Sequence, residues 1–138
     1  MDRETLQQIS RQRRREAAAL LKAGHYPGAY YLVGYSIECA LKACIAKQTK
    51  KHDFPDKQVA DKAWIHDLER LVNTAGISQD FERELKANRA LQLNWAIVKD
   101  WSENKRYDLT ITKAQARDFY SACTTRRNGI LPWIRRRW

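Results

Sequence analysis

"GAYYLVGYSIECALKA", residues Gly28 to Ala43, is filled almost throughout by apolar and small residues. The spacing of its larger side chains predicts a helix that begins near Pro27, runs to about Lys47 and buries one stripe. Small residues between them would let a neighbouring helix approach closely. The stripe comprises Tyr30, Val33, Gly34, Ile37, Leu41, Cys44 and Ile45, and the other small residues are Ser36, Ala40 and Ala43.

One carboxylate, Glu38, interrupts this apolar stretch, and Lys42 follows it one helical turn later. Three interpretations stay open. Glu38 could lie on a solvated face and pair with Lys42, which contributes a few tenths of a kcal/mol. It could instead be a buried anchor that accepts hydrogen bonds from Arg106, His66 or Tyr107, because a buried charge is tolerated only when it is paired. In the third interpretation, Glu38, His66 and Arg106 act together as base, acid and phosphate clamp.

The rest of the chain shows the same helical periodicity and almost no strand signal. Helices are predicted over residues 4–23, 66–76 and 78–102, and from Thr112 to a bend or break near Gly129 and Pro132. Gly24 and Gly76 would end helices, Ser78 would cap one, and residues 47–58 read as a polar loop. Short loops between amphipathic helices predict an all-α fold, an up-and-down antiparallel bundle of about five helices in one domain, residues 1–138.

The charge of the chain is concentrated at its two ends. The net charge is +10. Residues 1–24 hold six Lys or Arg against three Asp or Glu, residues 104–138 hold nine against two, and residues 25–103 hold eleven of each. If the two ends pack side by side, they form one basic face that favours nucleic acid, an acidic partner or anionic lipid. The alternative is that basic ends merely keep a small protein soluble.

The strongest basic and aromatic cluster is "RRNGILPWIRRRW", a basic C-terminal extension that begins at about residue 126. Its arginines could hold phosphates while an exposed tryptophan stacks on a base. In the alternative, Trp133 and Ile134 enter the core and the arginines are solvated at the negative end of a helix. The candidate nucleic-acid-binding residues are Arg126, Arg127, Arg135, Arg136, Arg137 and Trp138, with Arg13 and Arg14 from the N-terminal segment.

Other chemistries find little support in the residues. The three cysteines, Cys39, Cys44 and Cys123, have no paired spacing and read as core-filling residues. His25, His52 and His66 are scattered without carboxylates at ligand spacing, so no metal site is expected. No glycine-rich phosphate loop is present, and we expect no cofactor. No apolar run approaches the ~20 residues of a membrane span, and no secretory signal is evident, so the cytoplasm is the expected location.

Three segments in this order, "LLKAGHYPGAYYLVGYSIECALKA", "HDLERLVNTAG" and "WSENKRYD", resemble the HEPN domain family (higher eukaryotes and prokaryotes nucleotide-binding). The resemblance covers residues 14–122. It implies a small up-and-down helical bundle that is commonly a homodimer. It also implies one of several functions: a metal-independent ribonuclease, a partner of a nucleotidyltransferase, or a non-catalytic RNA- or nucleotide-binding module. The matching positions are Tyr30, Gly34, Glu38, Leu41, Lys42, His66, Asp67, Leu68, Arg106 and Tyr107.

The ribonuclease motif of that family, an arginine and a histidine separated by four to six residues near the start of the last core helix, is absent. No histidine follows His66. We therefore expect a non-catalytic or degenerate HEPN-like module that binds RNA or nucleotide, as in toxin–antitoxin or defence systems, with Glu38, Lys42 and Tyr107 as structural polar residues. One alternative is a ribonuclease that uses Glu38, His66 and Arg106. Another is a structural protein whose basic face docks an acidic partner such as a nucleotidyltransferase.

Overall fold

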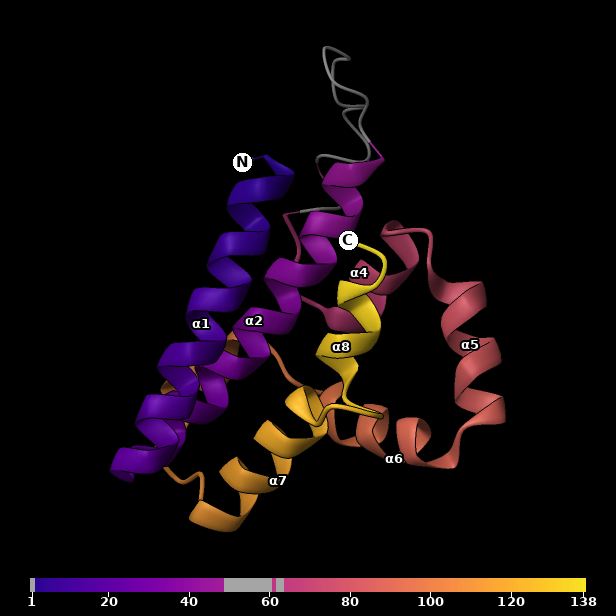
Figure 1. The fold of residues 1–138 in the computed structure, drawn as a ribbon. Helices are drawn as coiled ribbons and strands as arrows, with labels where there is room; N and C mark the ends of the chain where they lie inside the picture. Colours follow the sequence, from indigo (N-terminus) through magenta and orange to yellow (C-terminus); the bar gives the residue numbers. More distant parts are fainter. Residues whose placement is uncertain (1, 49–60, 62–63) are drawn as a thin grey trace.

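Two long helices, α1 (Arg3–Ala23) and α2 (Tyr26–Lys47), form an antiparallel pair (Figure 1). The computed structural model describes residues 2–48, 61 and 64–138, so most of the predicted polar loop, with His52, lies outside the described residues. Gly24 ends α1 as predicted, because its left-handed φ of 85° directs its N–H to the last carbonyls of the helix. The predicted close approach is confirmed at Ser10 and Ser36, whose hydroxyls each donate to the other's carbonyl oxygen at 2.8 and 2.7 Å.

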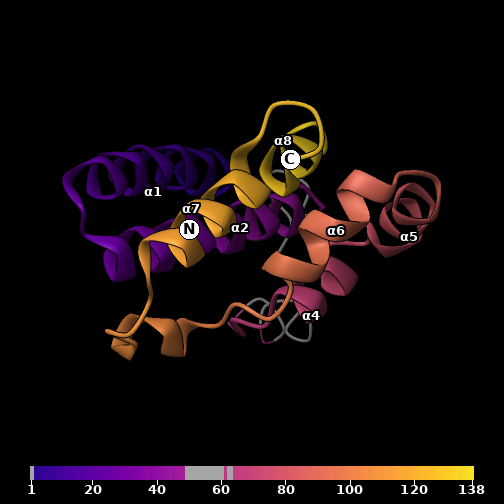
Figure 2. The ribbon, with the colours of Figure 1, turned by 90° about the horizontal axis from the view of Figure 1, so that it is seen from below.

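The remaining elements are shorter helices, some of which pack against α2 and others against one another. Every regular element within the described residues is a helix, which confirms the all-α class. Figures 1 and 2 place α5 (Ser78–Ala87) and α6 (Arg89–Val98) on the side of the molecule away from α1. These elements are α4 (Leu68–Thr74), α5 (Ser78–Ala87), α6 (Arg89–Val98), the 3-10 helix η1 (Glu103–Tyr107), α7 (Lys113–Thr124) and α8 (Ile130–Arg135).

The prediction of one helix over residues 78–102 is wrong, and this break raises the number of helices above five. Asn88 adopts an extended conformation between α5 and α6. Its side chain accepts the N–H of Leu91 at 3.1 Å and donates to the side chain of Asn128 at 2.9 Å. Ser78 is the first residue of α5 rather than its cap, since Ile77 occupies the cap position and no side chain caps this helix.

The predicted break near Gly129 is confirmed. Thr112 opens α7 with a reciprocal capping box to Gln115, and α7 ends at Thr124. The chain then turns at Gly129, where an added Cβ would overlap the carbonyl oxygen of Thr125. Because only glycine fits there, the C-terminal segment folds back as the separate helix α8.

The core surrounds α2. Its apolar stripe packs with residues of α4, α7 and α8, including Phe119, Leu68 and Leu131. All three cysteines are free and buried, which confirms that they fill the core. Trp133 and Ile134 are buried as well, so the tail enters the core at these two positions.

Candidate functional site

Glu38 is a buried, paired carboxylate on α2, only 1% exposed. Its Oε1 lies 2.8 Å from Nδ1 of His66, and its Oε2 accepts a hydrogen bond from Nζ of Lys42 at 3.2 Å. The solvated interpretation is therefore wrong. The pair with Lys42 forms, but it forms at the edge of the core. Of the three partners predicted for the buried anchor, the structure selects His66.

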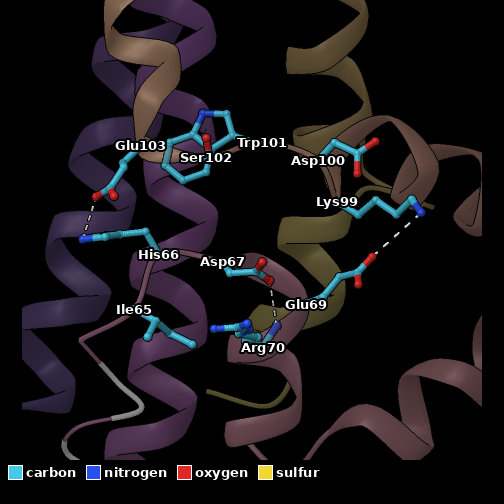
Figure 3. A pocket seen from close by; sticks show the side chains of 10 residues that line it. All are labelled: Ile65, His66, Asp67, Glu69, Arg70, Lys99, Asp100, Trp101, Ser102 and Glu103. Carbon is cyan, nitrogen blue, oxygen red and sulfur yellow. Dashed lines mark hydrogen bonds and ion pairs between the residues drawn. The ribbon is translucent and has the colours of Figure 1, made fainter.

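His66 stands between two carboxylates, those of Glu38 and Glu103, and Figure 3 shows the contact with Glu103. It directly precedes Asp67, which caps α4 by accepting the N–H of Arg70 at 3.0 Å. On the other side of the ring, Nε2 lies 2.7 Å from Oε2 of Glu103 in η1. Both ring nitrogens can donate only in the imidazolium form. Glu38, His66 and Glu103 thus connect α2, the start of α4 and η1.

Trp101 fixes the segment that carries Glu103. Its indole is buried against Gly34 of α2, where an added Cβ would overlap the indole nitrogen. That nitrogen is buried without a hydrogen-bond partner. The close approach of Trp101 to Gly34 therefore fixes where η1 packs along α2. This places Glu103 beside His66.

A pocket of about 520 Å³ opens beside His66, between the start of α4 and residues 99–103 (Figure 3). Its acidic side chains outnumber its basic ones, and Lys99 lies 3.8 Å from Glu69. A negative lining repels phosphate, so this pocket is a poor RNA site. The charged lining residues are Asp67, Glu69, Asp100 and Glu103 on the acidic side and Arg70 and Lys99 on the basic side.

Arg106 lies outside the Glu38–His66 contact. Its guanidinium is exposed and stands over the ring of Tyr107, 4.7 Å from the centroid, and hydrogen bonding to Tyr107 raises the pKa of Arg106. Among the described side chains, it forms no ion pair with Glu38. The arrangement supplies a hydrogen-bonded pair of a buried carboxylate and a partly exposed imidazole, and Arg106 does not join it. Sequence reasoning missed Glu103, which no spacing distinguishes from the other acidic residues.

The same carboxylates do not make a metal centre. They face opposite nitrogens of one imidazole ring, so they cannot converge on a single ion. Over the part of the chain that the structure describes, no group of three or more His, Cys, Asp or Glu side chains could hold a metal ion.

The two basic ends of the chain meet at Trp138. Nη2 of Arg3 donates to the main-chain oxygen of Trp138 at 2.8 Å. The guanidinium carbons of Arg11 and Arg135 lie 4.9 and 5.3 Å from the centroid of the Trp138 ring. Burial and then the nearby charges of Arg11 and Arg14 lower the pKa of Arg135. α1 and the C-terminal segment therefore bring three of their arginines together around Trp138.

The other predicted basic residues are dispersed. Arg137 turns inward, where it lies 3.4 Å from the ring centroid of Trp133 and donates to that residue's carbonyl oxygen at 3.0 Å. Arg13 pairs with Glu16 on α1. Exposed Arg126 and Arg127 lie in the connection between α7 and α8, at the opposite end of α8 from the C-terminus (Figure 1), and Arg136 is exposed at the end of α8.

No protein-family model, curated protein or solved structure matches this chain. The resemblance to HEPN domains therefore stays a prediction that rests on the three quoted segments. No helix among residues 2–48 and 64–138 is both long and apolar enough to cross a membrane.

Proposed function

We propose that this chain is a non-catalytic or degenerate HEPN-like module that binds RNA or nucleotide, of the kind found in toxin–antitoxin or defence systems. The observation that carries the proposal is the convergence of Arg3, Arg11 and Arg135, from opposite ends of the chain, on Trp138. Positive charge gathered on one face favours a polyanion.

Two features argue against catalysis. The arginine–histidine motif of the family's ribonucleases is absent from the sequence. In addition, both ring nitrogens of His66 face carboxylates, and Arg106 stands apart on Tyr107. A metal-free ribonuclease needs a group that is free to move the proton of the attacking 2′-hydroxyl, together with a cation near the phosphate. Here both ring nitrogens of His66 face carboxylates, and Arg106, the predicted phosphate clamp, lies on Tyr107 instead.

The test combines binding and cleavage on the same RNA. Purified protein is titrated into end-labelled structured RNA in chelator, and the mixture is followed by fluorescence anisotropy and by denaturing gel. We expect binding that weakens steeply with salt, and intact RNA. Absence of RNA binding at low salt would refute the proposal that the chain is an RNA-binding module. Cleavage that His66→Ala or Arg106→Ala abolishes would establish the ribonuclease alternative.

The basic face equally suits an acidic protein such as a nucleotidyltransferase, and the family resemblance implies a homodimer. Each of these two alternatives is tested by a separate measurement. A protein that serves only as a structural partner ignores RNA and is retained by the acidic partner at low salt. Sedimentation equilibrium of the isolated chain distinguishes a dimer from a monomer.

A further inference from the structure

The ring of Trp138 is already engaged by protein cations. Arg11 comes to it from α1, and Arg135 comes to it from the last turn of α8. Trp138 itself is half-buried. A guanidinium that stacks on an aromatic ring uses its π face, and its N–H groups lie in its plane. The ring thus packs against side chains of the protein itself, whereas the N–H groups of both arginines stay available to bind a ligand.

Among the described residues, neither these two arginines nor Arg14 of α1 has a carboxylate partner. Within the described residues, Arg11, Arg14 and Arg135 form no ion pair, and the buried Nε of Arg14 has no hydrogen-bond partner. The nearest acidic residue along α1, Glu16, is held by Arg13. Glu4 lies about 10 Å from Arg11 along the helix axis, at 1.5 Å per residue.

We propose that Arg11, Arg14 and Arg135 form a clamp for the phosphate groups of single-stranded RNA, in which Trp138 orders the arginines rather than stacking on a base. Planar guanidinium groups bind phosphate oxygens through paired N–H donors. An incoming phosphate would relieve the repulsion among the three positive charges. This inference rests on the proposed RNA binding and specifies its ligand group.

A phosphate clamp predicts binding that ignores base identity. Fluorescence anisotropy with oligouridylate and oligoadenylate of equal length should give the same affinity, because both carry the same backbone. For single strands the slope of log affinity against log salt is about −0.7 for each phosphate contact, so three contacts contribute about −2. The triple variant Arg11→Gln, Arg14→Gln, Arg135→Gln should lose this slope. It should bind about 100-fold more weakly near 0.1 M salt and nearly as well as wild type near 1 M.

The matched control removes the same charge elsewhere. Arg117→Gln, Arg126→Gln and Arg127→Gln alter three exposed arginines on α7 and in the connection between α7 and α8. We expect this control triple to keep most of the salt slope. Equal losses of RNA affinity and salt slope in the two triple variants would overturn the clamp. Nonspecific attraction between RNA and the basic surface would then explain the binding, and the proposed function would stand. Absence of binding by the wild type would refute the proposed function itself.

Two further measurements keep the inference open to refutation if the glutamine triple folds poorly by circular dichroism. Replacement of Arg11, Arg14 and Arg135 by lysine keeps the charge, so the salt slope should be retained while affinity falls a few-fold through the lost paired donors. Loss of the slope in a folded lysine triple would overturn the clamp. A strong preference for oligoadenylate that disappears in Trp138→Ala would show base stacking and would also overturn it.

Discussion

The contacts of Glu38 with Lys42 and His66 predict a measurable share of the stability of the fold. Glu38→Gln keeps the shape of the side chain and removes its charge. A hydrogen bond to a charged group contributes about 1.5–3 kcal/mol, and a neutral one about 0.5–1.5 kcal/mol. Glu38 makes two such contacts, to Lys42 and to His66. The substitution should therefore cost about 1 kcal/mol per contact, or about 2 kcal/mol of unfolding free energy.

The exposure of the partners decides how that loss is divided. His66 is 38% exposed and Lys42 is 17% exposed. Water screens the more exposed contact, so Lys42 should account for the larger share. The matched control is Glu16→Gln, since Glu16 pairs with Arg13 while 33% exposed. It should cost about 0.5 kcal/mol, as expected of an ion pair near the surface.

Equilibrium unfolding in urea, followed by circular dichroism, measures both substitutions. A double-mutant cycle with His66→Ala should give a coupling free energy of about 0.5 kcal/mol between Glu38 and His66, because Lys42 takes the larger share. The reasoning is refuted if Glu38→Gln costs no more than Glu16→Gln, because a carboxylate that water can reach would behave in that way.

Two further substitutions and one change of pH test other parts of the fold. Gly34→Ala should destabilise the protein by about 2 kcal/mol or more, because the added Cβ must displace the buried indole of Trp101; a thermal melt unchanged from wild type would contradict this. Asn88→Ala should cost about 1–2 kcal/mol in urea unfolding through loss of its helix cap. Burial raises the pKa of both Cys39 and Cys44 to about 11 from the usual 9.0. The folded state therefore keeps these protons longer than the unfolded chain does, and stability should fall as pH rises from about 9 toward 11. A urea midpoint that stays constant over that range would exclude this linkage.

Local sequence determined most of the helices and the positions where they end. The apolar stripe of residues 28–45, the glycine stop at Gly24 and the opening of α7 at Thr112 all follow from spacing and capping within a few residues. Sequence alone left three interpretations of Glu38 open, with Lys42 and His66 among its possible partners, and did not decide between a solvated and a buried carboxylate. Such features can be predicted from the sequence because a helical turn brings together residues only three or four positions apart.

Tertiary structure alone decided which distant residues meet. Asn88 breaks a helix that local propensity would continue, and it does so together with Asn128, forty positions further along the chain. The position of Trp101 against α2 brings Glu103 to His66. Packing of α1 with the C-terminal segment likewise brings Arg11 and Arg135 to one ring, whereas Arg126 and Arg127 remain apart. Sequence spacing could not foresee these choices, because they depend on how the helices pack and on the direction in which each side chain leaves its own helix.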